Sequence, residues 1–108
     1  MSVININNEN FQEEVANSDK IVIIDFYADW CGPCKIMGPI FEEVSKLYNN
    51  LKFVKVSVDE NQEISEKYGV QGIPAFLILK KGEVLDRIVG ASSKEDFKEK
   101  IDSILNKN

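Results

Sequence analysis

Two cysteines three positions apart, Cys31 and Cys34, are the residues of this chain best suited to chemistry. Positions three apart in a helix lie on the same side of one turn, so their Cα atoms fall within the roughly 4.4–6.8 Å that a disulfide spans. The pair can therefore be oxidised and reduced with little backbone movement. A bridge that closes so short a loop restricts the unfolded chain very little and stabilises the fold weakly. The spacing predicts reversible dithiol–disulfide chemistry.

The pair lies directly after an apolar strand-like segment and at the start of a helix-like one, and this position predicts a role for each thiol. Unpaired N–H groups and the positive dipole end at a helix N-terminus stabilise a thiolate, which is the attacking species in disulfide exchange. Cys31 lies at that end, so we expect it to be the nucleophile and the more exposed thiol. Cys34, one turn further in, then attacks the Cys31 sulfur and releases the reduced substrate.

The two residues between the cysteines, Gly32 and Pro33, offer neither a charge nor a side-chain donor that would strongly favour the thiolate, so we expect a reducing pair. The chain has no histidine, which excludes Cys–His catalysis and a His-assisted metal site. A zinc or iron–sulfur centre usually needs four ligands, and two cysteines supply half of them unless a dimer shares the metal. A binding module without redox turnover is the other alternative.

Asp25 interrupts an otherwise apolar segment, residues 21–27, six positions before Cys31. If this carboxyl group is buried, desolvation raises its pKa and suits it to accept the proton of Cys34. Alternatively, Asp25 lies exposed at the end of a strand. The periodicity of the segment does not decide between the two.

Composition and charge indicate one small globular domain, residues 1–108, with 44% hydrophobic and 29% charged residues. The net charge is −5, and the half that carries the cysteines is the acidic one, which argues against a nucleic-acid surface. The first twenty residues lack a basic start and an apolar run, and no segment approaches the ~18 apolar residues of a membrane span. We expect a cytoplasmic monomer without membrane or nucleic-acid partners.

Strands and helices alternate along the chain without a linker or repeat. Apolar runs and period-two patterns predict strands over residues 3–6, 21–27, 51–58, 75–79 and 83–89, the last two joined by a turn at Lys81-Gly82. Capping boxes at Asn10 with Glu13 and at Ser92 with Glu95 predict the starts of the first and last helices. A short helix over residues 61–68 precedes Gly69.

The helix after the cysteines and the last helix each carry an apolar stripe at helical spacing. The first stripe is Met37, Ile40, Phe41, Val44, Leu47 and Tyr48, and the second is Phe97, Ile101, Ile104 and Leu105. The element order βαβαβαββα predicts an α/β fold. Early βαβ crossovers require parallel strands and the late hairpin requires an antiparallel pair, so the sheet is a mixed five-stranded one flanked by four helices.

The run Trp30-Cys31-Gly32-Pro33-Cys34 after a hydrophobic strand, together with Ile73-Pro74 and the Lys81-Gly82 turn, resembles the thioredoxin family over essentially the whole chain. The resemblance implies the thioredoxin fold and protein-disulfide reduction with no cofactor beyond the Cys31–Cys34 disulfide. It also implies a thioredoxin reductase, supplied by NADPH or ferredoxin, as the electron source. Gly-Pro between the cysteines is similar to the reducing members, whereas oxidising relatives carry a histidine there.

The resemblance further implies roles for residues outside the cysteine pair. It places Asp25 in a buried position with Lys55 beside it, and it makes the Ile73–Pro74 bond cis, although trans is the ordinary form of such bonds. The substrate-binding surface then consists of Trp30, Gly32, Pro33, Ile73, Pro74, Val89, Gly90 and Ala91. One departure is Tyr27, where the best-known bacterial members carry a second tryptophan.

Overall fold

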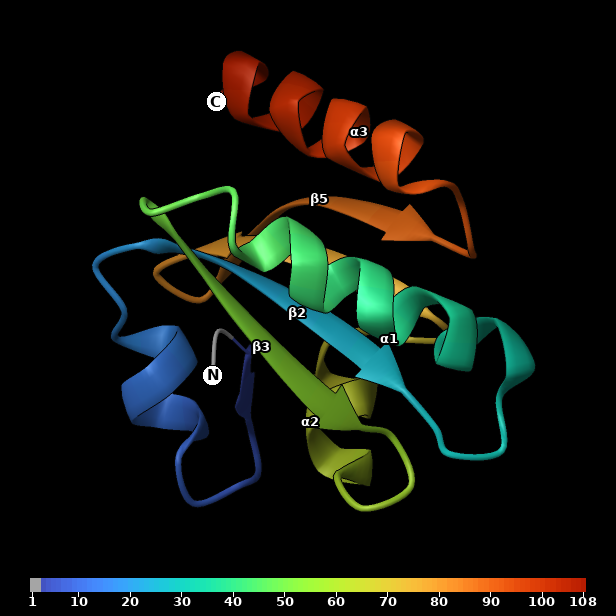
Figure 1. Cartoon of the computed structure of the whole chain (residues 1–108). Coiled ribbons are helices and arrows are strands. Elements are labelled where there is room, and N and C mark those ends of the chain that lie inside the picture. Colours follow the sequence, from blue (N-terminus) through green and yellow to red (C-terminus); the bar gives the residue numbers. More distant parts are fainter. Residues whose placement is uncertain (1–2) are drawn as a thin grey trace.

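A five-stranded mixed sheet forms the centre of the computed structural model, which describes residues 3–108 (Figure 1). The strand order is β1-β3-β2-β4-β5; β1, β3 and β2 pair in parallel, and β4 pairs antiparallel with both β2 and β5. This arrangement confirms the predicted α/β class and element order. The strands are β1 (Val3–Asn5), β2 (Ile21–Tyr27), β3 (Leu51–Ser57), β4 (Ala75–Lys80) and β5 (Glu83–Val89).

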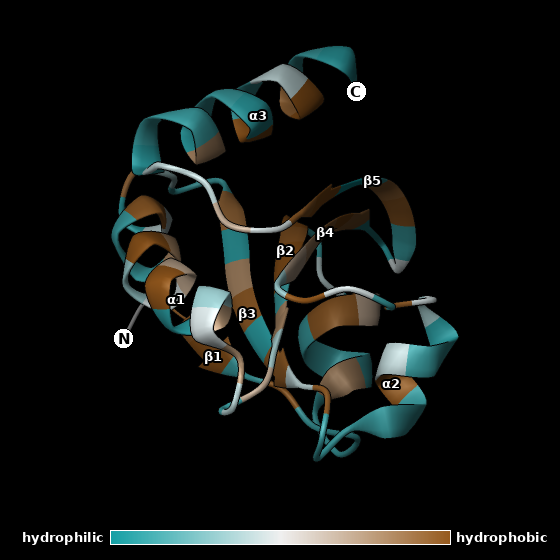
Figure 2. Ribbon diagram, turned by 90° about the vertical axis from the view of Figure 1, so that its right-hand side faces the viewer, coloured by the Kyte–Doolittle hydropathy of each residue, from teal (hydrophilic) through white to brown (hydrophobic). Residues whose placement is uncertain are grey.

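Helical segments cover both faces of the sheet. The helices α1 (Gly32–Ser45) and α3 (Lys94–Lys107) lie on one face, and the π-helical segment η1 (Gln12–Ala16) and helix α2 (Gln62–Lys67) lie on the other (Figure 1). Figure 2 shows the apolar residues of α3 on its sheet-facing side and polar residues on its outer side. No helix among the described residues is both long enough and apolar enough to cross a membrane.

Strand β2 is buried on both faces because it lies between β3 and β4 and beneath helical segments on each side. Val22, Ile24 and Phe26 pack in the core under η1 and α2, whereas Ile23 packs in the core under α1 and α3. Side chains alternate along a strand, so Asp25 lies on the same face as Ile23. The nearly unbroken apolar run predicted this two-sided burial, which is confirmed.

The β4–β5 hairpin turns at the predicted residues. Lys81 and Gly82 have φ angles of 50° and 83°. Positive φ at both central residues is what a two-residue type I′ turn requires, and its twist matches that of the flanking strands. The turn therefore sets the pairing of Leu79 and Lys80 with Val84 and Glu83.

Both predicted capping boxes are wrong. Asn10 does not cap η1, because its Oδ1 accepts a hydrogen bond from the N–H of Asn7 at 2.8 Å in the preceding turn. Helix α3 is capped one residue later than expected, by Ser93, whose Oγ accepts from the N–H of Asp96 at 3.1 Å. The Ser92 side chain is turned into the protein instead. At α3 two neighbouring serines compete for the cap, and the path of the incoming chain decides which one is in place. The N-cap residue of η1 is Phe11, and no side chain caps that segment.

The apolar stripe of α1 is confirmed except at Leu47, which is 52% exposed. Helix α1 ends at Ser45, and the N–H groups of Lys46 and Leu47 bond to carbonyls three residues earlier. This tighter turn rotates Leu47 away from the core, so helical periodicity no longer describes its direction.

Phe41 of α1 lies at the centre of an aromatic cluster beneath α1 and α3. Its ring centroid is 5.1 Å from that of Phe53, 5.6 Å from that of Phe76 and 6.2 Å from that of Phe97. We expect Phe41→Leu to lower the free energy of unfolding by about 1–2 kcal/mol, because the strands beneath cannot collapse into the space left by the ring. Urea denaturation measures the change. Leu47→Ala, at an exposed site, is the control, and an equal loss in both variants would contradict the prediction.

Candidate active site

Four strands contribute to one edge of the sheet. The parallel strands β2 and β3 both end there, β4 begins there because it runs antiparallel to β2, and β5 ends there as well. The register places Phe26, Ala75 and Val89 side by side across this edge. The loop from β2 into α1 leaves from the same edge (Figure 1). Loops at the carboxyl ends of parallel strands are the usual location of sites in α/β proteins.

Cys31 and Cys34 lie in that loop and in the first turn of α1. They form a disulfide, with their Cα atoms 5.2 Å apart, as the spacing predicted. Cys31 is the N-cap of α1, and its Sγ accepts a hydrogen bond from the N–H of Cys34 at 3.2 Å. Pro33 occupies the first turn of the helix, where no N–H partner is needed. The N–H of Cys34, in the first turn of α1, is thus directed at the Cys31 sulfur.

The two cysteines are almost equally buried in the disulfide form. Cys31 is 5% exposed and Cys34 is 6% exposed, so the prediction that Cys31 is the more exposed thiol is wrong for this state. The reason is packing over the pair, to which Ala28, Tyr27 and Ile73 contribute. Position at the helix N-terminus, rather than exposure, distinguishes the two sulfurs.

The Ile73–Pro74 peptide bond is cis, as the resemblance implied, and it lies beside the disulfide. The carbonyl oxygen of Ile73 is 3.9 Å from the Sγ of Cys31. Pro74 is buried, and its carbonyl accepts a hydrogen bond from the N–H of Gly90 at 2.9 Å. Gly90 has a φ of 93°, a conformation that favours glycine. The hydrogen bond between Gly90 and Pro74 joins the loop after β5 to the segment that faces the cysteines.

Asp25 is buried beneath α1, with 4% of its surface exposed, and the alternative of an exposed strand end is wrong. It is paired in register with Lys55 on one side and Phe76 on the other. Desolvation raises the pKa of Asp25 to about 7, and the Lys55 cation opposes this shift. The Oδ1 atom has no hydrogen-bond partner in the part of the chain that the structure describes. Such a carboxyl group exchanges a proton near neutral pH.

Lys55 is half-buried on the same face of the sheet as Asp25. Its Nζ lies 5.8 Å from the centroid of the Tyr27 ring. Tyr27 is paired with Ser57 at the end of β2, and it also packs against the cysteines. Lys55 and Tyr27 therefore lie next to Asp25 on the same face of the sheet.

The thioredoxin family model matches residues 2–103. The chain belongs to the thioredoxin family. It is 45% identical to a thioredoxin of Chlorobaculum thiosulfatiphilum over 95 residues, which are 87% of this chain and 88% of the relative. It is 42% identical to the thioredoxin of Bacillus subtilis strain 168 over 106 residues, 97% of this chain and 100% of the relative. The thioredoxin of Buchnera aphidicola subsp. Acyrthosiphon pisum is 42% identical over 105 residues, 96% of this chain and 97% of that one.

Membership of the thioredoxin family indicates the activity of the Cys31–Cys34 pair. Thioredoxins are thiol–disulfide oxidoreductases, and the Cys31–Cys34 bridge has the position and spacing of their redox-active disulfide. The chain is a protein-disulfide reductase, and a thioredoxin reductase returns it to the dithiol form. Thioredoxins need no cofactor beyond this disulfide. Within residues 3–108, no group of three or more His, Cys, Asp or Glu side chains is placed to hold a metal ion.

Around this thioredoxin disulfide lie several exposed apolar residues. Trp30 is 68% exposed and Val89 is 63% exposed, while Ile73 is half-buried between strand and solvent. The smaller residues Gly32, Pro33 and Ala91 are also exposed. Gly72 is exposed as well, and a Cβ atom at this position would lie 3.6 Å from the Val89 side chain. The residues that the resemblance assigned to substrate binding therefore reach solvent at this edge, except Pro74.

Two further residues close to the cysteines in the fold or the sequence were not predicted as site residues. Ile36, on α1, is 62% exposed, and an apolar residue outside the buried stripe of a helix was the signal for it. Asp59, in the turn after β3, accepts a hydrogen bond at 2.8 Å from the indole Nε1–H of Trp30. No local pattern indicates this second contact, because the two residues lie 29 positions apart in the sequence.

Proposed function

We propose that Cys31 is the nucleophile and Cys34 the resolving thiol of this protein-disulfide reductase. The observation that carries the assignment is the N-cap position of Cys31, whose Sγ accepts the N–H of Cys34. The Cys31 thiolate attacks one sulfur of the substrate disulfide and expels the other as a thiolate. The Cys34 thiolate then attacks the Cys31 sulfur, which releases the second substrate thiol and forms the Cys31–Cys34 bridge. Two electrons pass to the substrate.

Asp25 is the proposed proton acceptor for Cys34 in the resolving step. A carboxylate with a pKa near the working pH is the best general base for a thiol, because it is ionised in part and still basic. Its burial on the face of β2 that α1 covers supports this role, since the buried Cys34 belongs to the first turn of α1. Lys55 is the proposed partner that limits the pKa rise of Asp25 and keeps part of it ionised at neutral pH.

The proposed docking surface is the rim made of Trp30, Gly32, Pro33, Ile73, Pro74, Val89, Gly90 and Ala91. An extended substrate segment that lies along Ile73 would bring its disulfide to Cys31, because the Ile73 carbonyl is 3.9 Å from the Cys31 Sγ. The exposed side chains of Trp30 and Val89 supply apolar contact area. Recognition through backbone and apolar contacts suits an enzyme with many protein substrates.

We propose that residues 1–108 form one thioredoxin domain that acts as a cytoplasmic monomer, with a thioredoxin reductase and protein disulfides as its partners and without nucleic acid. The radius of gyration of 12.5 Å supports a single domain, since a compact chain of this length has about 13 Å. The excess of carboxylates in the half of the sequence that carries the cysteines disfavours binding to a nucleic-acid phosphate backbone. Size-exclusion chromatography with light scattering tests the monomer.

The reduced protein is expected to reduce an accessible protein disulfide catalytically. Insulin is a convenient substrate, with dithiothreitol as electron source and turbidity of the released chain as readout. The physical reason is that a helix N-terminus favours the thiolate that attacks. A rate equal to that of dithiothreitol alone would contradict the redox assignment. Metal content by mass spectrometry, measured on the same sample, tests the alternative of a dimer that shares a metal between two pairs of cysteines.

A further inference from the structure

Trp30 projects from the loop beside Cys31 with little packing to hold it. The side chain is 68% exposed, the highest value among the large apolar residues at positions 3–108. An indole in that setting can adopt several rotamers, and each binding event would have to select one of them. The hydrogen bond from its Nε1–H to Oδ2 of Asp59, at 2.8 Å, restricts this freedom. A carboxylate acceptor makes such a bond stronger than a neutral one.

Asp59 is itself held in place by the turn that carries it. The N–H of Val58 donates to the carbonyl of Tyr27 at 2.9 Å, which fastens the turn to the end of β2. The N–H of Asn61 donates to the carbonyl of Ser57 at 3.0 Å, and the buried Asn61 side-chain amide donates to the same carbonyl at 3.1 Å. The turn that carries the Asp59 carboxylate, the acceptor for Trp30, is therefore anchored to the sheet by hydrogen bonds.

We propose that Asp59 is a positioning residue of the reductase: its carboxylate holds the Trp30 indole as one wall of the docking surface next to Cys31. This inference rests on the proposed docking surface. It assigns to Asp59 no contact with the reacting sulfurs. Because the indole is already held in one orientation, less conformational entropy is lost when a protein substrate binds. Asp59 therefore acts on KM rather than on the chemical step.

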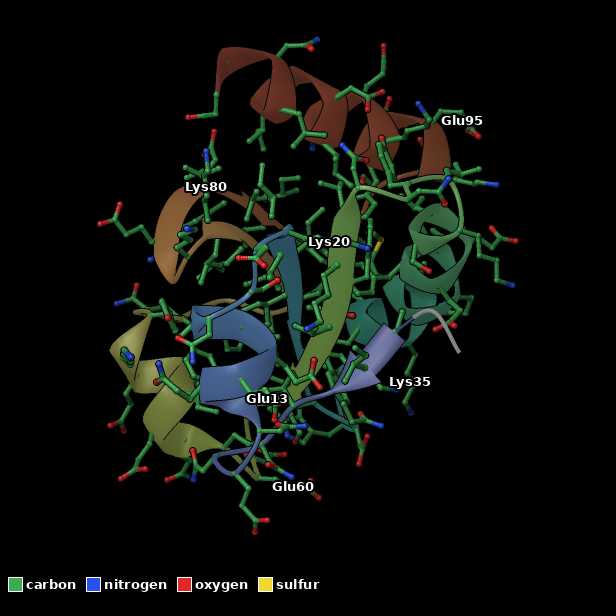
Figure 3. All side chains as sticks on the ribbon, turned by 90° about the vertical axis from the view of Figure 1, so that its left-hand side faces the viewer. Glu13, Lys20, Lys35, Glu60, Lys80 and Glu95 are labelled. Carbon is green, nitrogen blue, oxygen red and sulfur yellow. A yellow bond between two sulfur atoms is a disulfide. The ribbon has the colours of Figure 1, made fainter. Side chains whose placement is uncertain are left out.

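Three substitutions separate positioning from charge. Asp59→Ala removes the acceptor, and we expect KM for insulin to rise about fivefold with kcat changed by less than about twofold. Asp59→Asn keeps an acceptor oxygen without the charge, and we expect KM near that of the parent protein. Glu60→Ala removes the neighbouring exposed carboxylate of the same turn, labelled in Figure 3, and is the matched control with no expected change.

The indole gives a direct readout, because Trp30 is the only tryptophan of the chain. Time-resolved fluorescence anisotropy is expected to show a faster local motion of the indole in Asp59→Ala, and the parent decay in Asp59→Asn and Glu60→Ala. In a Trp30→Phe background, which lacks the N–H donor, Asp59→Ala is expected to have no further effect on KM. Reduction of 5,5′-dithiobis(2-nitrobenzoate), a disulfide too small to need the surface, is expected to be unchanged.

Three results would overturn the proposal: unchanged anisotropy in Asp59→Ala, an equal KM effect in the Trp30→Phe background, or the same KM rise in Asp59→Asn as in Asp59→Ala. The last of these would make Asp59 a charge that attracts substrates. Failure of the proposed function is distinguishable, because it would appear in the parent protein as absence of insulin reduction, whereas failure of this inference leaves the parent rate intact.

Discussion

Cys34→Ser is expected to accumulate mixed disulfides through Cys31, and Cys31→Ser to accumulate almost none. In the first variant, attack on the substrate proceeds from the helix N-terminus, but no thiol remains to attack the Cys31 sulfur. In the second variant, the remaining thiol lies one turn inside α1 and is 6% exposed in the disulfide form. Catalytic reduction of insulin is expected to fall to the rate of dithiothreitol alone in both.

The measurement is non-reducing electrophoresis with mass spectrometry after each variant is mixed with an oxidised protein substrate. Cys34→Ala, which also lacks the second thiol, is the matched control and is expected to trap as Cys34→Ser does. Trapping through Cys34 in the Cys31→Ser variant, with none through Cys31 in Cys34→Ser, would reverse the assigned roles. The two cysteines are almost equally buried in the disulfide form, so exposure does not distinguish their reactivities. Trapping through Cys31 alone would show that position at the helix N-terminus determines which thiol attacks.

Asp25→Asn is expected to be more stable than the parent protein above neutral pH and equally stable near pH 4. The folded pKa of Asp25, about 7, lies above its unfolded value of ~3.9, so the folded state binds more protons between these limits. The favourable contribution of the protonated carboxyl group is complete below ~4 and is lost as the pH rises through 7. A difference of about three pH units corresponds to a gain of up to about 4 kcal/mol in the amide variant.

The same substitution removes the proposed acceptor of the Cys34 proton. We therefore expect resolution of the mixed disulfide to slow by about 10²-fold at pH 7, the lower end of general-base effects. Denaturant midpoints between pH 4 and 8 measure stability, and rapid mixing with a disulfide substrate measures resolution. Asp29→Asn, at an exposed carboxylate in the loop after β2, is the control. A variant with parent stability at pH 8 and a parent resolution rate would show that Asp25 is neither destabilising nor a base.

The spacing of residues along the chain was enough to predict much of the fold. The double-sided burial of β2 followed from its apolar run. The period-two pattern of residues 51–58 predicted the strand β3, in which Val54 and Phe53 pack in cores on opposite faces of the sheet. The two-residue turn at Lys81-Gly82 followed from local backbone preference. Each of these features depends on residues within a few positions of one another, so it can be predicted from the sequence alone.

Local patterns failed at the ends of helical segments. Ser92 and Ser93 both suit an N-cap, and the structure uses Ser93. Asn10 suits a helix start, yet its side chain completes the turn before η1. Leu47 continues the periodicity of α1, but the helix ends first. In each case the deciding interaction comes from the direction of the incoming or outgoing chain.

The sequence by itself determined the redox chemistry of this protein, because two cysteines three apart at a helix start specify both a closable disulfide and an activated sulfur. Only the tertiary structure decided the surroundings of the two cysteines. Burial of Asp25 depends on its place between Lys55 and Phe76, and the hold on Trp30 depends on Asp59, 29 residues away. These contacts arise from the pairing and packing of distant segments. Their energies depend on burial and distance, which no local pattern of residues encodes.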